Sequence, residues 1–433
     1  MAEINIGIIG FLVLFILLLF KMHIAMAMGL IGFLGFAYVA DFKSALSLLR
    51  TVPYTSMADY NLSVIPLFVL MGSFCFYAGL SKDLYDSAHK LLGQIRGGLA
   101  IATVAACAGF AAISGSSVAS AATMGTVALP EMKRYNYDKG LASGSVAAGG
   151  TIGSLIPPSV ALILYGIITE QSIGKLFLAG FFPGILEALF YIITIYIICR
   201  INPLLGPPGP RTGILEKISS LKNTWIVVAL FVLVLGGIYL GIFSPTEAAG
   251  IGAFGSLVFG FLRGKIGWKG FKDSFIDTGK TSGMIFFILV GAMIFNYFMA
   301  VSRLPFEISE FINSLTQNRY VVITIILVIY IILGCVMDSI AMMLLTVPIF
   351  FPLIQLLNFD PIWFGILVVR VSEIGQITPP IGLNVYIIKG VAEDIPMGTI
   401  FRGVIPFIIA DIFNVILLIA VPQISLFLPN LVK

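Results

Sequence analysis

Two stretches of eight residues, TIGSLIPP at 151–158 and EIGQITPP at 373–380, end in the same pair of prolines and lie 222 positions apart. A proline inside a helix lacks the N–H that would bond the carbonyl four residues earlier, and its ring pushes that carbonyl away. The two pairs therefore predict two broken helices. They expose the carbonyls of Gly153 and Ser154 in one half and those of Gly375 and Gln376 in the other.

The same spacing relates longer segments of the two halves. Residues 114–173 and 336–395, compared without gaps, share eleven identities, concentrated at prolines, glycines and loop aspartates. An offset of 219 extends the match upstream and pairs SVIPLFVLMG at 63–72 with SGMIFFILVG at 282–291. Such self-similarity at a fixed spacing indicates one structural unit used twice.

The composition places the chain in a lipid bilayer. Hydrophobic residues make up 59% of it and charged residues 11%, with a mean hydropathy of +1.06. Apolar runs recur, as at 4–20, 24–40, 63–80, 223–243 and 403–428, and predict an all-α polytopic membrane protein with ten to twelve segments. The first run is expected to be a retained helix and not a signal peptide. The four cysteines indicate neither a disulfide nor a metal site, and no nucleic-acid partner is expected.

Basic residues orient the chain. If 81–97 is a cytoplasmic loop, alternation of the segments places 17 of the 25 Lys and Arg residues inside, including Arg211, and six outside, including Lys433. Both chain ends then lie on the outer side.

Basic loops flank 98–130 on both ends, at 81–97 and 131–139, so this stretch predicts a re-entrant hairpin from the cytoplasm. In the second half the loop after the corresponding stretch, 353–360, carries no Lys or Arg, so that hairpin is expected to enter from outside. Inverted repeats with broken helices are typical of secondary transporters.

The exposed carbonyls favour Na⁺, a hard cation that prefers several oxygen ligands. Ser114, Ser116 and Ser117 add hydroxyl oxygens at the first hairpin tip, and the repeat places Asp338 and Ser339 at the second. Serines in an apolar helix also commonly bond their own backbone. The membrane part of the first unit, 98–130 and 140–168, has no acidic residue, which favours sodium over protons. In the second unit Asp338 and Glu373 keep proton coupling open.

Charged residues within lipid are functional candidates. Arg370 lies five residues before Gly375 and either meets an anionic substrate or pairs with Glu373 or Asp338. Glu187 indicates a contact between helices or subunits, and Lys280 is expected to extend to an interface. Asn384 and Gln376 are further polar candidates for the cavity.

Other functional classes fit less well. An intramembrane hydrolase would need a general base, yet the only histidines, His23 and His89, lie on the flanks away from the serine-rich tips. A channel needs no inverted pair of ion sites. GKTS at 279–282 lacks the earlier glycine of a phosphate-binding loop, because Ser274 occupies that position.

Several long motifs resemble one family. GFAAISGSSVASAATMGTVALP at 109–130, SPTEAAGIGA at 244–253, GCVMDSIAMMLLTVPIFFP at 334–352 and ITPPIGLNVYIIKG at 377–390 resemble the large membrane subunit of tripartite ATP-independent periplasmic (TRAP) transporters, the DctM-like family. The resemblance implies a transporter and not an enzyme. It also implies an elevator mechanism, in which a transport domain moves against a scaffold, and Na⁺-driven uptake of an organic acid across a bacterial inner membrane.

The resemblance also implies sites and partners. It places one Na⁺ site at Ser114, Ser117, Gly150, Thr151 and Ser154, and a second at Gly334, Asp338, Gly375, Thr378 and Gly382. Substrate is expected between the tips, with Ser116, Ser117, Ser339, Arg370 and Asn384 as its candidate ligands. The partners implied are a periplasmic substrate-binding protein and a small four-helix membrane subunit, expected as a separate chain. The carried anion is a carboxylate or sulfonate, and an H⁺-coupled or stand-alone organic-anion carrier is the alternative.

The expected domains follow the repeat. Segments 98–168 and 321–391, each a hairpin plus a broken helix, form the transport domain, whereas 1–97, 169–320 and 392–433 form the scaffold. Within the scaffold, 41–62 and 301–320 are amphipathic and predict arms that lie along the membrane interface.

Overall fold

The computed structural model describes residues 2–210, 212–315 and 318–431, and within these ranges every regular element is a helix. Arg211 and Lys433, both assigned a side of the membrane above, lie outside the described residues. The first half contains α1 (Ala2–Leu19), α2 (Ile24–Val39), α3 (Phe42–Met57), η1 (Tyr60–Ser63), α4 (Val64–Tyr77), α5 (Leu80–Leu92), α6 (Gly98–Ser114), α7 (Ser117–Arg134), α8 (Lys139–Thr151), η2 (Ile152–Ser154), α9 (Val160–Thr169) and α10 (Ile173–Ile201).

The second half repeats much of this order. It contains α11 (Ile214–Tyr239), α12 (Pro245–Leu262), α13 (Trp268–Ser302), α14 (Leu304–Leu315), α15 (Arg319–Gly334), α16 (Ser339–Leu356), α17 (Pro361–Ile377), α18 (Leu383–Val391), α19 (Met397–Ala420) and α20 (Gln423–Leu431).

The chain is a multi-pass membrane protein. Six helices of the described residues are long and apolar enough to cross a bilayer, and the bent pair Ile214–Lys222 and Thr224–Tyr239 would make a seventh. Five shorter apolar helices are further candidates: Ile4–Leu19, Ile24–Val39, Gly98–Ser114, Val160–Thr169 and Arg319–Gly334. The count of ten to twelve segments stays a prediction.

Both predicted helix breaks are present. Helix α8 ends at Thr151 and α9 begins at Val160, whereas α17 ends at Ile377 and α18 begins at Leu383. The Pro157–Pro158 and Pro379–Pro380 peptide bonds are both cis. Each half therefore carries a break at the position that its proline pair predicts.

Equivalent residues of the two repeats form the same turns and helix caps in the two halves. Asn136 and Asn358 both take positive φ angles, of 57° and 55°. Asp138 then caps α8 by accepting from Leu141 N, and Asp360 caps α17 by accepting from Ile362 N and Trp363 N. A short polar side chain tolerates the left-handed conformation and an aspartate satisfies free N–H groups at a helix start, so the shared residues mark shared turns.

Two predictions about the connecting segments were wrong. The segment 81–97 is not an open loop, because helix α5 fills it to Leu92; its polar and apolar residues alternate at helical spacing. The apolar run 403–428 is not one helix, because α19 ends at Ala420, just before Pro422, and α20 follows.

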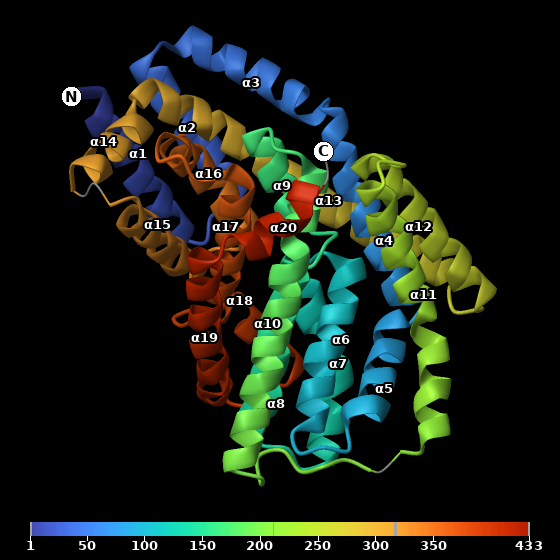
Figure 1. The fold of residues 1–433 in the computed structure, drawn as a ribbon. Helices are drawn as coiled ribbons and strands as arrows, with labels where there is room; N and C mark the ends of the chain where they lie inside the picture. Colours follow the sequence, from blue (N-terminus) through green and yellow to red (C-terminus); the bar gives the residue numbers. More distant parts are fainter. Residues whose placement is uncertain (1, 211, 316–317, 432–433) are drawn as a thin grey trace.

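The helices make two extensive sets of contacts, which α11 links because it packs against α5 as well as α12. Helix α13 packs against α2, α3 and α4, and α12 packs against α4 and α11. Helix α8 packs against α6, α7 and α19, while α10 packs against α6, α17, α19 and α20 (Figure 1). The amphipathic stretches form α3 and α14, and α3 crosses one end of the molecule in Figure 1.

Candidate functional site

The first hairpin tip joins α6 to α7 and rests on the break of its own half. Gly115 turns the chain with φ +63°, and a Cβ there would lie 2.5 Å from Pro158 O. Ser116 caps α7 by accepting from Ala119 N at 3.3 Å. Gly115 O accepts from Val160 N, the first residue of α9, at 3.3 Å. The first hairpin tip therefore packs directly against the broken helix of its own half.

The second tip, between α15 and α16, is built in the same way. Asp338 occupies the position equivalent to Ser116 and caps α16, accepting from Ile340 N and Ala341 N at 3.2 Å. Cys335 O accepts from Gly382 N, beside the start of α18, at 3.3 Å. The two halves thus place a hairpin tip on a proline break twice.

The residues of the first predicted cation site are brought together in part. A Cβ on Gly153 would lie 2.7 Å from both Ser116 O and Ser120 Oγ, and Ser120 Oγ lies 3.0 Å from Ser114 Oγ. Gly150 packs on α7, where a Cβ would lie 2.7 Å from the Cβ of Ala121. Hydroxyl and carbonyl oxygens of the tip therefore surround the break at Gly153.

Two residues of that site point elsewhere. The Thr151 hydroxyl contacts Glu187 Oε1 at 2.8 Å and Tyr191 Oη at 3.0 Å, away from the tip. Ser117 Oγ donates to Gln376 Oε1 at 3.4 Å, so it reaches the second half. Thr151 can offer an ion its backbone carbonyl more readily than its side chain.

The second predicted site has a similar geometry. Gly334 lies against α17, where a Cβ would come within 2.9 Å of Ser372 O, and a Cβ on Gly375 would meet the Gly334 backbone at 2.5 Å. A Cβ on Gly382 would lie 3.2 Å from Thr378 O. Carbonyl oxygens of α17 and of the break after it therefore lie beside Gly334 and Gly382, while the Asp338 carboxylate caps α16.

The structure corrects one detail of the carbonyl argument. Ser154 O accepts from the Ser159 hydroxyl, and Gly375 O accepts from Thr378 N at 3.0 Å. Two of the four carbonyls predicted to be free thus have partners within the chain. Such groups can still coordinate an ion, because a carbonyl oxygen has two lone pairs.

A buried polar cluster links α17 to the starts of α7 and α16. Gln376 Nε2 donates to Ser339 Oγ at 2.7 Å and to Glu373 Oε1 at 3.1 Å, while the Ser339 hydroxyl also donates to Glu373 at 3.1 Å. Ser117 completes the cluster from the first half. Ser117 and Ser339 are repeat equivalents, so the cluster lies between matching points of the two units.

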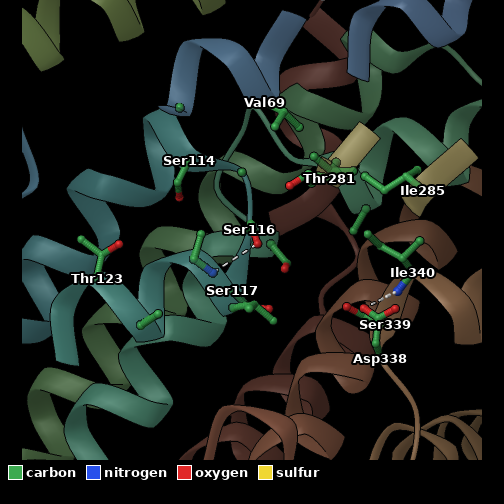
Figure 2. A pocket seen from close by; sticks show the side chains of 18 of the residues that line it. Val69, Ser114, Ser116, Ser117, Thr123, Thr281, Ile285, Asp338, Ser339 and Ile340 are labelled. Carbon is green, nitrogen blue, oxygen red and sulfur yellow. Dashed lines mark hydrogen bonds between the residues drawn. The ribbon is translucent and has the colours of Figure 1, made fainter. Parts of the chain in front are cut away.

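A cavity of about 560 Å³ lies between the two tips and the α4–α13 wall. Figure 2 shows Ser114, Ser116 and Ser117 on one side and Asp338, Ser339 and Ile340 on the other, with Val69, Thr281 and Ile285 in the upper part of the view. Residues at the starts of four helices line it, those of α7, α9, α16 and α18. A helix start presents free N–H groups and about half a positive charge, so the arrangement suits an anion.

The charged residues that line this cavity are acidic. Asp338 lines it from the second tip and Asp277 from α13, and among the described residues none of its lining side chains is Lys, Arg or His. The Tyr77 hydroxyl donates to Asp277 Oδ2 at 2.7 Å and holds the carboxylate at the wall. An anion here would rely on the N–H groups at the helix starts, since no basic side chain of the described residues lines the cavity.

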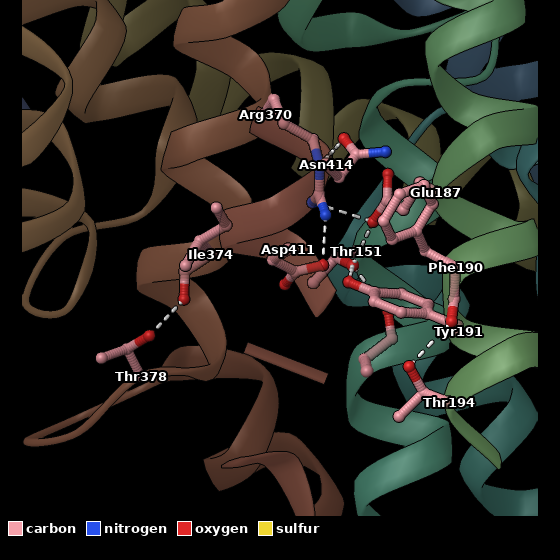
Figure 3. A network of polar contacts seen from close by, with 11 residues as sticks. Thr151, Glu187, Phe190, Tyr191, Thr194, Arg370, Ile374, Thr378, Asp411 and Asn414 are labelled. Atoms are coloured by element: carbon pink, nitrogen blue, oxygen red, sulfur yellow. Dashed lines mark hydrogen bonds and ion pairs between the residues drawn. The ribbon is translucent and has the colours of Figure 1, made fainter. Parts of the chain in front are cut away.

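Arg370 lies in a separate buried network (Figure 3). It pairs with Glu187 Oε1 of α10 at 2.9 Å and with Asp411 of α19, and it donates to Asn414 Oδ1 at 3.2 Å. Its partners are therefore these two carboxylates rather than the predicted Glu373 or Asp338. The guanidinium does not line the cavity, and all three charged side chains are at most 1% exposed.

Asn384, also predicted to bind substrate, is buried in the first turn of α18. Neither polar atom of its amide has a hydrogen-bond partner among the described residues. A buried amide of this kind is costly unless a ligand or water meets it.

The sequence reasoning missed three residues. Ser120 lies one helical turn after Ser116, and that spacing could have shown that it faces the same break. Asp277 lies one turn before Thr281 on a helix expected to be plain scaffold. Asp411 lies in the C-terminal apolar run, and a carboxylate within lipid is itself a signal for a buried partner.

Comparison with known proteins identifies the family. Residues 11–424 match the model of the tripartite ATP-independent periplasmic transporter, DctM component. The chain belongs to the DctM family. Members of this TRAP family are transporter permeases and not enzymes.

Curated DctM relatives cover most of the chain. The C4-dicarboxylate TRAP transporter large permease of Pseudomonas aeruginosa is 37% identical over 87% of this chain and 88% of its own. The sialic acid large permease of Vibrio cholerae is 32% identical, with coverage of 86% and 87%. The isethionate TRAP permease DctMQ of Oleidesulfovibrio alaskensis is 33% identical over 91% of this chain and 62% of that protein.

Solved structures support the fold alone. The YdaH transporter of Alcanivorax borkumensis aligns with a TM-score of 0.63 at 15% identity, covering 89% of this chain and 88% of that one. MtrF of Neisseria gonorrhoeae aligns with a TM-score of 0.52 at 14% identity, covering 87% and 84%. The DctM chain thus shares an all-helical transporter fold with both.

Proposed function

We propose that this DctM chain is the large permease subunit of a TRAP transporter that uses a Na⁺ gradient to import a small organic anion. One observation carries the proposal: the cavity between the two tips is lined by the starts of α7, α9, α16 and α18. Converging helix starts near the middle of a membrane protein are a way to bind an anionic substrate. The relatives named for C4-dicarboxylates, sialic acid and isethionate support an organic acid or sulfonate as the substrate.

Sodium is the proposed coupling ion, with about two ions per cycle. The oxygens around Gly153 come from the Ser116 carbonyl and the Ser114 and Ser120 hydroxyls. In the second half the Ser372 carbonyl lies beside Gly334, and the Gln376 and Thr378 carbonyls lie beside Gly382. These are hard, uncharged ligands that suit a monovalent cation. Within the described residues there is no group of three His, Cys, Asp or Glu side chains that could hold a transition metal.

Two coupled ions would offset the acidic character of the cavity. With Na⁺ at each tip, the positive charge of the ions and the helix starts together stabilise an anion that no basic side chain meets. Substrate binding then depends on Na⁺ binding, which is the requirement for coupling.

An elevator mechanism is the proposed motion, with the two hairpins re-entrant and the repeats inverted. The tips and broken helices would move against α1–α4 and α11–α14. The network of Arg370 ties α10 and α19 to α17 through buried charges, so we place these two helices with the moving part and not with the scaffold of the predicted boundaries. Helices α3 and α14 would lie along the membrane interface as arms.

The proposed partners follow the TRAP system. A periplasmic substrate-binding protein would deliver the anion, and a small membrane subunit would bind the scaffold. The isethionate relative, of which this chain covers 62%, is named DctMQ, consistent with a fusion of the two membrane subunits. We place the complex in the bacterial inner membrane with both chain ends on the periplasmic side.

The test is uptake into proteoliposomes that contain this chain with its partners. A Na⁺ gradient should drive accumulation of the anion, whereas an equal H⁺ gradient in K⁺ buffer should not. Uptake that is unchanged when Na⁺ is replaced contradicts the coupling, and uptake driven by H⁺ alone supports the alternative carrier.

A further inference from the structure

The wall opposite the hairpin tips carries an acidic side chain that the transport scheme does not use. Asp277 lines the cavity from α13, together with Thr281 one turn later and Ser73 of α4. Its carboxylate accepts from the Tyr77 hydroxyl at 2.7 Å, so its position is fixed by a helix on the same wall. The tips and this wall therefore present different chemistry to one bound molecule.

The charges near Asp277 leave it without a cationic partner. Asp273 lies one turn earlier on α13 and carries the same sign of charge, and Tyr77 contributes only its hydroxyl. Lys280, three residues later, is exposed and does not line the cavity. In the described part of the chain no basic side chain lies within 4.0 Å of the Asp277 carboxylate.

The side of the cavity formed by the hairpin tips can stabilise a limited amount of negative charge. Asp338 places a negative charge at the start of α16, whereas the uncharged Ser116 and Ser159 cap the starts of α7 and α9. An anion therefore has the starts of α7, α9 and α18 and the proposed Na⁺ ions. These groups can stabilise one acidic group of a substrate. A second acidic group of the same molecule would extend toward the wall and face Asp277.

On this basis we infer that the carried substrate has a single negative charge and bears hydrogen-bond donors, hydroxyl, amide or ammonium groups, at the end opposite its acid group. Asp277 acts as the specificity-determining residue. A donor at the wall can bond to Asp277 and Thr281, whereas a second carboxylate would be repelled by an unpaired like charge. The inference rests on the proposed function, because it takes the cavity between the tips as the substrate site.

Two probes of equal size separate the possibilities. Succinate and succinamate have the same number of heavy atoms, but at neutral pH the first carries two carboxylates and the second one carboxylate and one amide. Calorimetric titration of the complex of this chain with its small membrane subunit, in Na⁺ buffer without the binding protein, measures both affinities. We expect succinamate to bind tighter by about tenfold or more, as an uncompensated repulsion of 1.4 kcal/mol or more requires.

Variants on α13 then assign the effect. Asp277→Asn should shift the affinity ratio toward succinate by about tenfold, because the amide accepts and donates without charge. Asp273→Asn removes the same charge one turn away from the cavity and should keep the wild-type ratio. The comparison of ligands on the wild-type complex needs no variant, so a failure of Asp277→Asn to assemble does not prevent the test.

The possible failures differ in meaning. Equal Na⁺-dependent binding of the two probes to the wild-type complex, or an unchanged ratio in Asp277→Asn, overturns the inference and leaves the proposed function standing. Binding of the probes that is the same in Na⁺ and K⁺ buffer overturns the proposed function and the inference with it.

Discussion

Replacement of Arg370 by Gln tests whether this residue supports the fold or touches the substrate. The guanidinium lies between Glu187 and Asp411, and all three side chains are at most 1% exposed. In Arg370→Gln both carboxylates remain buried without a cation. Removing one partner of a buried ion pair costs about 3–5 kcal/mol, because the remaining charge loses its compensation. We expect a loss of stability of this size in the variant.

The assay has two readouts on the same purified complex. Thermal unfolding followed by intrinsic fluorescence should show a lower midpoint for Arg370→Gln, whereas the affinity for the transported anion, measured on the folded fraction, should equal that of the wild type. Glu187→Gln and Asp411→Asn, combined with Arg370→Gln, remove all three charges and should recover most of the lost stability. Lys133→Gln, which breaks a solvent-exposed pair with Asp394, is the matched control and should change the midpoint little.

The opposite pattern would refute this reasoning. If Arg370→Gln unfolds at the wild-type temperature while the anion binds more weakly, the arginine acts on the substrate and the buried pairs contribute little. A triple variant that is less stable than Arg370→Gln alone would likewise contradict the charge argument.

Three further predictions concern the tips. Gly153→Ala places a Cβ 2.7 Å from Ser116 O and should abolish Na⁺-dependent uptake. Gly250→Ala is the control, because a Cβ there meets nothing within 4 Å. Uptake with wild-type Na⁺ dependence in Gly153→Ala contradicts the first ion site. Ser117→Ala removes the hydroxyl that reaches Gln376 and should raise the Na⁺ concentration for half-maximal uptake; an unchanged value argues against Ser117 as a ligand. Asp338→Asn keeps a good helix cap and therefore the fold, but should weaken the Na⁺ response; full retention of that response assigns the residue to capping alone.

Local sequence signals predict the helix breaks and the repeat. The pairs Pro157–Pro158 and Pro379–Pro380 break their helices by a local effect, because the missing N–H groups and the bulky rings act on the neighbouring turn. Single prolines such as Pro130 and Pro183 remain inside helices. The repeated asparagines and aspartates likewise fix turns by local geometry. For this reason the ends of α8 and α17 fall where the sequence places them.

The ion pairs that Arg370 makes with distant residues are harder to predict from the sequence. The partners of Arg370 lie 183 and 41 positions away, on α10 and α19, and nothing in the spacing of these residues shows that the three helices meet. Of the two carboxylates predicted as its partners, Glu373 lies one helical turn away on α17 and Asp338 lies at the hairpin tip of the same half. Tertiary packing therefore decided this network and not local spacing.

The amphipathic helix α5 shows a different limit. The stretch 81–97 contains Lys82, Asp83, His89 and Lys90, which read as a solvated loop by composition. In the structure Leu80, Tyr85 and Ala88 are buried on one face, and Asp83 pairs with Arg263. A charged stretch becomes a helix when a neighbouring surface covers its apolar face.

The most direct measurement of the central claim is thiol labelling at the first tip. The four native cysteines are buried, so Ser116→Cys adds one reactive thiol that lines the cavity. We expect a hydrophilic maleimide to label it more slowly when Na⁺ and the transported anion are both present, and not with the anion in K⁺ buffer. Ser219→Cys, exposed on α11, should label equally under all conditions. A Ser116→Cys labelling rate that ignores Na⁺ and the anion would contradict a substrate site between the tips.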